Sequence, residues 1–506
     1  MAGPSARHKV VVVGAGVGGL VTTLELAASG VEVVLCEAAL EPGGKMRRVQ
    51  IGQNWLDAGP TVFTMRWVFD ELFTQLGETL TDHLRLHKLP TLARHSWKDG
   101  GAGGQHFDLF ADIQRSADAI GDFSGAAEAR RYLAFCERAR LIYQTLEGPF
   151  LRSSRPNPLS LSMRVAGQGL SGLARMSPFG TMWGELGRYF HDPRLQQLFG
   201  RYATYCGSSP FMAPATLMLV AHVEQDGVWL LDGGMHALAT ALEKLARERG
   251  VMFNYNCKVA EILTQSGKAS GVRLASGEVI HAAAVVFNGD VAALAAGLLG
   301  DGIASSVATA PSAQRSLSAI TWNLVSPTSG FELLRHNVFF SSDSPAEFDA
   351  LFRQKQLPTD PTVYVCAQDR SDEQCMTAGT AERLLCLVNA PAVGDALSAA
   401  NIARCDDTVF AKLARNGLHL DRSSASTVRT TPADFNRLFP ATGGALYGQA
   451  SHGWQASFAR PGARSKLKGL YLVGGSAHPG PGVPMAALSG RQAAASVLAD
   501  LPKGQK

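Results

Sequence analysis

Three glycines near the N-terminus have a spacing that could serve a phosphate group. Gly14, Gly16 and Gly19 follow the pattern GxGxxG directly after an apolar run. In such a turn the first glycine permits a tight bend, the second leaves room for a pyrophosphate at a helix N-terminus, and the third allows close packing of helix on sheet. Glu37 follows the next apolar run, where a carboxylate accepts hydrogen bonds from ribose hydroxyls. The spacing therefore predicts a dinucleotide site.

A second glycine-rich stretch, YLVGGSAHPGPGVPMAALSG at 471–490, lies near the C-terminus. It opens on a short apolar strand and closes on a helix of small residues, with Pro484 at the expected first helical position, where its missing N–H costs no hydrogen bond. Glycine lets a main chain approach a ligand closely. We expect this turn to present peptide N–H groups, backed by a helix dipole, to a flat or anionic ligand.

The first glycine turn requires a strand before it, a helix after it and a second strand beyond. Residues 9–13 supply a buried strand of valines, the helix is predicted to end near Gly30, and 31–37 reads as the second strand. Further along, 271–290 is typical of a hairpin and a buried strand that returns to the same sheet. The sequence contains no second GxGxxG unit of this kind, so soluble NAD is not expected.

Composition limits the classes of protein and partner. The chain has 506 residues with 46% hydrophobic content, enough for a large core and two or more folded units. The net charge of +4 is small and no basic stripe alternates with aromatic residues, which excludes nucleic acid as an expected partner. Eight cysteines without a CxxC pair predict reduced packing thiols and no metal site. With no secretory signal and no membrane-spanning apolar stretch, we expect a cytoplasmic protein.

Acid–base candidates are few. His236 and His478 lie in glycine-rich stretches, where a histidine more often makes structural hydrogen bonds than transfers protons. Asp57 and Asp232 are expected to cap loops. The sequence therefore names no catalytic residue.

Several of these stretches together resemble the FAD-binding flavoproteins of the amine oxidase and carotenoid desaturase superfamily. LEPGGKMRR at 40–48 follows the second strand, DAGPTVFT spans 57–64, and a glycine pair opens a helix after WLLD at 229–232. The family usually has Gly-Gly-Arg where this chain has Lys45. The resemblance implies FAD as the cofactor.

The same resemblance assigns further cofactor-binding residues. Gly44 and Lys45 would supply a backbone amide and a cation to the diphosphate. Gly59, Pro60 and Thr61 would pass beside the flavin ring, and the backbone of Val259 would meet the adenine. At the C-terminal turn, Gly475, Val483, Pro484 and Met485 would face the pyrimidine side of the isoalloxazine, where a helix dipole stabilises the negative charge of reduced flavin.

The fold implied is α/β: a discontinuous Rossmann-like FAD-binding domain, similar to amine oxidases and glutathione reductase, over 1–69, 226–294 and 441–506. A mixed α+β substrate domain is expected over 70–225 and 295–440, with a helical membrane-associating region. The segment 151–201 carries seven arginines among apolar residues. This segment fits either an anionic bilayer surface or a solvated basic face.

Over its whole length the chain most resembles bacterial carotenoid desaturases of the phytoene desaturase type. The C-terminal stretch matches their signature, and 200–242 is closer to the hydroxycarotenoid 3,4-desaturase branch, also called methoxyneurosporene dehydrogenase. That branch removes two hydrogens at C3–C4 of a 1-hydroxy or 1-methoxy acyclic carotenoid. A cation spread over a polyene loses a proton readily, which agrees with the missing general base.

The resemblance also implies partners: the acyclic carotenoid, oxygen or a quinone as electron acceptor, and the inner or intracytoplasmic membrane as a peripheral docking surface. Three alternatives remain open. A phytoene desaturase-type enzyme would act on an earlier carotenoid. A flavin amine oxidase would share both glycine motifs but needs an aromatic cage. A non-catalytic prenyl-lipid-binding protein would hold no flavin.

Overall fold

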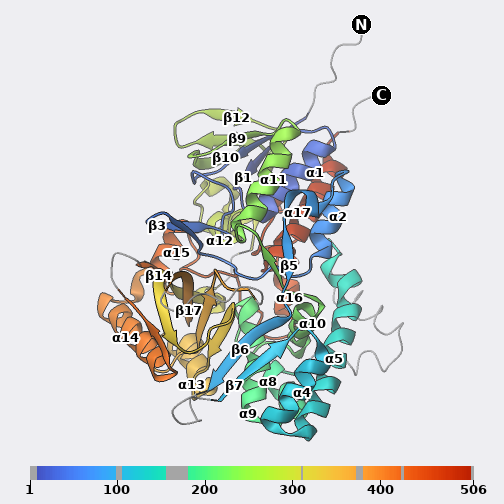
Figure 1. Cartoon of the computed structure of the whole chain (residues 1–506). Coiled ribbons are helices and arrows are strands. Elements are labelled where there is room, and N and C mark those ends of the chain that lie inside the picture. The colour runs from blue at the N-terminus through green and yellow to red at the C-terminus, as the bar shows by residue number, and fades with distance from the viewer. Residues whose placement is uncertain are drawn as a thin grey trace.

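A computed structural model describes residues 8–97, 105–154, 180–308, 311–371, 380–422 and 427–502. Two sheets organise the chain, one toward the top of Figure 1 beside both termini and one toward the bottom. The figure also shows a group of helices beside the lower sheet. The predicted α/β class, with an amine oxidase-like flavoprotein fold, is confirmed.

The upper sheet has five strands, and every neighbouring pair is parallel. In spatial order the strands are β20 (Leu470–Leu472), β13 (Ala284–Phe287), β1 (Lys9–Val13), β2 (Glu32–Cys36) and β9 (Met252–Asn254). Because these strands are parallel, their carboxyl ends lie at the same edge of the sheet. The glycine turn after β1 and the turn after β20 therefore both lie at that edge.

Helices cover one face of this sheet and a small antiparallel sheet covers the other. The helices are α1 (Val17–Ala28), α11 (His236–Glu248) and α17 (Val483–Asp500), and the small sheet comprises β10 (Val259–Gln265), β11 (Lys268–Leu274) and β12 (Val279–His281). Val10 and Val12 pack with the helices, whereas Val11 packs with the small sheet. Both faces are buried, which explains the unbroken valine run in β1.

The lower sheet is mixed and has eight strands. They are β18 (Leu418–Leu420), β14 (Ser318–Gly330), β17 (Ala381–Ala390), β16 (Val363–Ala367), β15 (His336–Phe339), β6 (Thr91–Trp97) and β7 (Gln105–Phe110), with β19 (Thr427–Thr430) also paired to β14. Only the β15–β6 pair is parallel among these strands as described.

Side chains alternate across the lower sheet with a period of two, so each strand contributes to both faces. Trp322 and Leu384 pack with α14 (Ala399–Arg415) on the outer face. Their neighbours Thr321 and Leu385 point to the opposite face and line a cavity. One face of this sheet is thus structural core, and the other is the wall of the site.

A helical layer packs beside β6 and β7 around a core of its own. It contains α4 (Ile113–Ser124), α5 (Ala126–Leu146), α8 (Met182–Tyr189), α9 (Pro193–Gly200), the 3-10 turns η2 (Arg201–Cys206) and η3 (Ala215–Met218), and α10 (Leu219–Asp226). Asp112 caps α4 and Asp192 caps α9 by accepting backbone N–H groups. These caps fix where each helix begins.

Shorter elements connect these layers. They are β3 (Arg48–Ile51), β4 (Asn54–Asp57), α2 (Trp67–Gln75), α3 (Leu80–His83), β5 (Leu86–Lys88), η1 (Glu147–Leu151), β8 (Trp229–Leu231), α12 (Val291–Ala295), η4 (Asp301–Ser306), η5 (Ser312–Gln314), α13 (Ser344–Asp349), η6 (Ala350–Gln354), η7 (Gly394–Ala396), α15 (Pro432–Leu438) and α16 (Ala456–Ala459). The hairpin and returning strand predicted over 271–290 are present as β11, β12 and β13.

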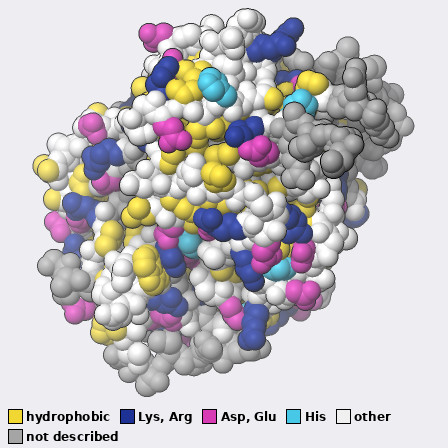
Figure 2. All heavy atoms as spheres, turned by 90° about the horizontal axis from the view of Figure 1, so that it is seen from above, with side chains coloured by type: hydrophobic (Ala, Val, Ile, Leu, Met, Phe, Trp, Pro, Cys, Tyr) yellow, Lys and Arg dark blue, Asp and Glu magenta, His cyan; other side chains and the backbone are white. Residues whose placement is uncertain are grey.

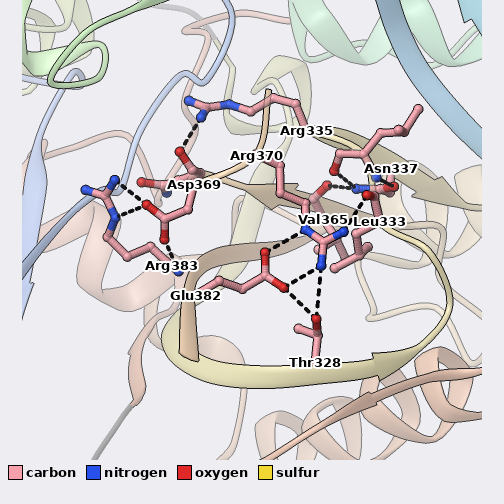
Figure 3. Close-up of polar contacts among 11 residues, drawn as sticks. Thr328, Leu333, Arg335, Asn337, Val365, Asp369, Arg370, Glu382 and Arg383 are labelled. Atoms are coloured by element: carbon pink, nitrogen blue, oxygen red, sulfur yellow. Dashed lines mark hydrogen bonds and ion pairs between the residues drawn. The ribbon is translucent and has the colours of Figure 1, made fainter. Parts of the chain in front are cut away.

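A network of paired charges and hydrogen bonds joins β14 and β17 of the lower sheet to nearby loop residues (Figure 3). Arg370 donates two hydrogen bonds of 2.8 Å to the carboxylate of Glu382, which Thr328 also contacts, and Arg370 Nη1 donates to the carbonyl of Leu333. We call these four residues the edge network. On the upper face, Figure 2 shows basic and acidic side chains interspersed with apolar ones, as expected from the small net charge.

Candidate cofactor and substrate cavity

One cavity of about 1280 Å³ extends from the carboxyl edge of the parallel sheet to the inner face of the eight-stranded sheet. Its volume exceeds the several hundred cubic ångströms typical of a site for one small ligand. The predicted residues that line it are Gly14, Gly16, Glu37, Gly44, Lys45, Gly59, Pro60, Thr61, Val259, Gly475, Val483, Pro484 and Met485. Among the predicted residues, Gly19 alone lies outside the lining.

The first glycine turn is packed so tightly that side chains would not fit. Gly14 has φ +101°, and a Cβ on Gly19 would lie 2.2 Å from the Gly14 carbonyl oxygen. A Cβ on Gly16 would lie 2.8 Å from Asn288 Nδ2, which itself donates to the Gly14 carbonyl. Gly19 therefore closes the turn while Gly16 faces the cavity. Sequence reasoning missed Asn288, although a polar residue directly after a buried strand was the available signal.

Two helices begin at this cavity without a side-chain cap. Gly16 is the N-cap of α1 and Gly482 is the N-cap of α17, and neither helix receives a side-chain hydrogen bond there. The first N–H groups of a helix need partners, and the macrodipole adds positive potential at the same place. An anionic group such as a diphosphate fits these two helix ends.

Glu37 follows β2 at the same edge of the sheet. Its carboxylate accepts the N–H of Ala15 at 2.6 Å and the N–H of Ala39 at 2.8 Å. These bonds hold the carboxylate beside the glycine turn and within the cavity lining, together with Val259. An acceptor in that position suits ribose hydroxyls.

A second pair of glycines brings two further loops onto the first turn. Gly43 and Gly44 have φ +121° and +57°, and a Cβ on Gly44 would lie 3.1 Å from the Gly16 Cα. A Cβ on Gly59 would lie 1.9 Å from the Lys45 carbonyl oxygen. The loops around Gly44 and Gly59 therefore pack closely together beside the first glycine turn. Their close approach favours glycine at these positions.

Lys45 is partly buried in the cavity wall. Its Nζ donates to the carbonyl of Leu446 at 2.5 Å and lies 5.2 Å from the ring centroid of Phe439. Burial lowers the pKa of Lys45, and the nearby Asp290 opposes that shift. The side chain thus provides a hydrogen-bond donor next to the loops around Gly44 and Gly59.

Arg460 holds the C-terminal glycine turn in place. Its guanidinium donates to the carbonyls of Tyr447, Gly475 and Gln449 at 2.6 to 3.2 Å. Burial lowers the pKa of Arg460. Sequence reasoning missed this residue because its partners are main-chain carbonyls, which leave no pattern in side-chain types.

Three of the four acid–base candidates make structural hydrogen bonds. Asp57 accepts the N–H groups of Met235 and His236 at the start of α11, and burial raises the pKa of Asp57. His236 Nε2 lies 2.9 Å from the carbonyl oxygen of Pro42. His478 Nε2 lies 2.8 Å from that of Ser153, and burial lowers the pKa of His478 to about 4.

Asp232 differs from these residues because it lies at an exposed position. Its Oδ1 is 3.0 Å from His87 Nε2, and both side chains are more than half exposed. Asp232 therefore lies away from the cavity lining.

The far half of the cavity is lined mainly by apolar side chains, including Leu385, Leu387, Val338, Val220 and Val223. A set of polar side chains interrupts this surface: Thr61, Arg201, Tyr205, Glu224, His336 and Tyr364, which we call the cavity cluster. The Tyr205 hydroxyl donates to Glu224 at 2.7 Å, and the Arg201 guanidinium lies 5.6 and 5.5 Å from the rings of Tyr205 and Tyr364. Burial raises the pKa of Glu224.

The arginine-rich segment 151–201 is only partly described, since Arg155, Arg164 and Arg175 lie outside the described residues. The prediction that Arg201 belongs to the surface segment is wrong. Arg201 is the first residue of η2 and lines the cavity beside Tyr205. Arg194 folds back onto Asp192 at 2.6 Å, whereas Arg188 keeps an exposed side chain. The guanidinium of Arg201 lies over the rings of Tyr205 and Tyr364 in the cavity wall.

No helix in the described part of the chain is both long and apolar enough to cross a membrane.

The parallel sheet, the uncapped helix ends and the long cavity define an FAD-binding oxidoreductase of the amine oxidase fold. Residues 17–498 match the sequence profile of the flavin-containing amine oxidoreductases. The chain belongs to that family and, within it, to the bacterial carotenoid desaturases.

Several relatives carry the name hydroxyneurosporene desaturase. The one from Rubrivivax gelatinosus is 56% identical over 503 residues, which cover 99% of this chain and 95% of the relative. The one from Cereibacter sphaeroides is 44% identical over 497 residues, covering 97% and 98%. A structure of putrescine oxidase bound to putrescine covers 98% of this chain and 100% of its own, with a TM-score of 0.60 and 16% identity, so that likeness concerns the fold alone.

Proposed function

We propose that this protein is an FAD-dependent carotenoid desaturase that introduces the C3–C4 double bond into a 1-hydroxy or 1-methoxy acyclic carotenoid. The observation that carries the proposal is the single cavity that joins the glycine turns to a long apolar chamber. A nucleotide at one end and a hydrocarbon chain at the other would share it. The names of the two relatives support a carotenoid as the substrate.

In this proposal the predicted residues divide along the length of FAD. Gly14, Gly16 and the N-terminus of α1 hold the pyrophosphate, Glu37 the ribose, and the backbone of Val259 the adenine. Gly44, Lys45, Gly59, Pro60 and Thr61 lie along the flavin, and Gly475, Val483, Pro484 and Met485 face its pyrimidine side. When bound, FAD supplies the acceptor for a hydride, and the electrons then pass to oxygen or a quinone.

The chain's own residues exclude water and orient the substrate. Leu385, Leu387 and Val338 present apolar surface to the hydrocarbon, and α10 closes the opposite side with Val220 and Val223. Loss of a hydride and a proton from adjacent carbons yields the double bond. The proton leaves an extended polyene cation, which is acidic enough to need no strong base.

FAD loading tests the cofactor assignment. We expect Gly16→Val to abolish flavin retention, because its side chain would occupy phosphate space and meet Asn288. Gly302→Val is the matched control, since a Cβ there meets nothing within 4 Å. The flavin absorbance of each purified protein is the measurement. Equal flavin content in both variants would reject the pyrophosphate site.

Turnover tests the reaction. FAD-loaded protein is incubated with liposomes that carry phytoene, neurosporene or 1-hydroxyneurosporene, and products are measured by absorption and mass. We expect loss of two hydrogens and a red shift from the hydroxylated substrate. Conversion of phytoene would indicate the earlier desaturase step, and peroxide release from amines with inert carotenoids would indicate an amine oxidase.

We also propose peripheral docking on an anionic membrane, because a carotenoid must leave a bilayer to enter the cavity. The segment 151–201 remains the candidate surface, without Arg201. Liposome flotation should require anionic lipid and weaken at high salt. Charge reversal at Arg164, Arg175 and Arg188 should reduce flotation, whereas reversal at Arg273, exposed on β11, should not. Unchanged flotation of the triple variant would reject this surface.

A further inference from the structure

We propose that His336 is a specificity-determining residue, whose Nε2–H donates a hydrogen bond to the oxygen on C1 of the substrate. The inference rests on the proposed function, since it assigns a residue that reads the oxygen of the hydroxylated or methoxylated carotenoid. His336 is on β15, on the same face as Val338, and both line the cavity. The imidazole is thus a polar group within an apolar wall.

The imidazole has one nitrogen satisfied and one free. His336 Nδ1 lies 2.7 Å from the Tyr364 hydroxyl, whose oxygen lies 2.7 Å from Thr61 Oγ1. His336 Nε2 is buried and has no hydrogen-bond partner among the described residues. The side chain is only 3% exposed, so solvent at the protein surface does not satisfy that nitrogen. An unpaired polar atom in a buried wall is costly, and a ligand oxygen would remove that cost.

The hydrogen-bond chain is compatible with a ring proton on the unpaired nitrogen. If Thr61 donates to Tyr364 and Tyr364 donates to Nδ1, the ring proton is on Nε2. Burial and the nearby guanidinium groups of Arg335 and Arg201 lower the pKa of His336 to about 3, which keeps the ring neutral. A donor is the group required, because a methyl ether oxygen can only accept a hydrogen bond while a hydroxyl can do both.

The hydrogen bonds through Tyr364 and Thr61 connect the imidazole of His336 to the end of the cavity at the glycine turns. Thr61 is two residues from Gly59, whose Cα packs against the Lys45 carbonyl, and Gly44 in turn packs on Gly16. Recognition of the oxygen on C1 is therefore fixed relative to the glycine turns by one short loop. C3 and C4 lie only two and three carbons from C1, so a hydrogen bond there would hold the bond to be oxidised at a set position.

The test compares substrate preference across matched variants. The preference is the ratio of kcat/KM for 1-hydroxyneurosporene to that for 1,2-dihydroneurosporene, which lacks only the C1 oxygen function. We expect a preference of about 10-fold to 100-fold in the native protein, as one buried hydrogen bond provides. His336→Phe, which keeps the ring against Tyr364, should lower this preference at least about 10-fold through a loss in kcat/KM for the hydroxylated substrate.

Further variants separate positioning from general damage. Tyr364→Phe removes the hydroxyl that contacts Nδ1 and should lower the preference by about 3-fold to 10-fold. Tyr132→Phe, which removes an equally buried hydroxyl outside the cavity lining, should leave the preference unchanged. His95→Phe tests the other cavity imidazole with an unpaired nitrogen, and it too should leave the preference unchanged.

Each outcome has one meaning. Failure of the FAD-loaded native protein to convert any carotenoid would reject the proposed function itself. Equal conversion of hydroxylated and unsubstituted carotenoids would keep the function and overturn the inference, as would a preference that survives both His336→Phe and Tyr364→Phe. Loss of preference in His95→Phe alone would overturn the assignment to His336 and indicate that His95 binds the oxygen. Rejection of the 1-methoxy substrate would overturn the donor assignment.

Discussion

The eight-stranded sheet carries two buried polar groups that are built in opposite ways. In the edge network, Glu382 is 1% exposed and both carboxylate oxygens accept hydrogen bonds from Arg370 and Thr328 (Figure 3). In the cavity cluster, His336 is similarly buried but keeps one ring nitrogen unpaired. The first group is saturated by the protein, whereas the second is left incomplete.

The side of the sheet explains this difference. Glu382 shares the outward face of β17 with Leu384, which packs against α14, so a free charge there would meet only protein. His336 lines the cavity, where a ligand can supply the missing partner. We infer that Glu382 is kept for stability and that His336 is kept for binding.

Removing Glu382 should have the largest effect on stability. Glu382→Ala leaves the Arg370 guanidinium without its carboxylate in a buried site. We expect a loss of about 3 kcal/mol in the free energy of unfolding, the lower end for broken buried pairs because Arg370 remains 18% exposed. Urea denaturation measures it. The preference for the hydroxylated substrate should not change, and a loss below about 1 kcal/mol would contradict the structural role of the edge network.

A smaller effect should appear at low pH. Because the folded pKa of His336 is about 3 and the unfolded value is about 6.5, the unfolded chain binds a proton that the folded chain does not. This contribution to stability is fully present above pH 6.5 and is lost as the pH falls toward 3. From pH 7.5 to pH 5 the native protein should therefore lose about 2 kcal/mol more than His336→Phe.

The native protein and His336→Phe both contain the other buried histidines. The contributions of those histidines to the pH dependence of stability therefore cancel in the comparison. The two unfolding free energies are measured at both pH values. Parallel pH dependence of the native protein and His336→Phe would mean that His336 is protonated in the fold.

The smallest effect is expected for His336→Phe at neutral pH. The variant loses the bond to Tyr364 but also removes the unpaired nitrogen, and these changes offset each other. The free energy of unfolding should change by less than about 1 kcal/mol, against about 3 kcal/mol for Glu382→Ala. Thermal denaturation of the two variants side by side measures this. A loss as large as that of Glu382→Ala would make His336 a structural residue and erase the comparison.

Local sequence was sufficient for the nucleotide half of the molecule. The valines of β1, the glycines of the first turn and the small residues of α17 carry their requirements in their own types, because tight turns and buried parallel strands restrict which residues fit. The prediction of FAD followed from these stretches and from the family they resemble. The predicted domain boundaries and the individual contacts with FAD stay predictions.

Only the tertiary structure assembled the cavity cluster. Thr61, Arg201, Glu224, His336 and Tyr364 come from a loop, a 3-10 turn, a helix and two strands, and nothing in their spacing links them. Arg201 was predicted as part of a surface segment, but its guanidinium lies over two aromatic rings in the cavity wall. Residue types encode a turn because the backbone there is local, whereas a binding wall is decided by which strands become neighbours and which face of each strand turns inward.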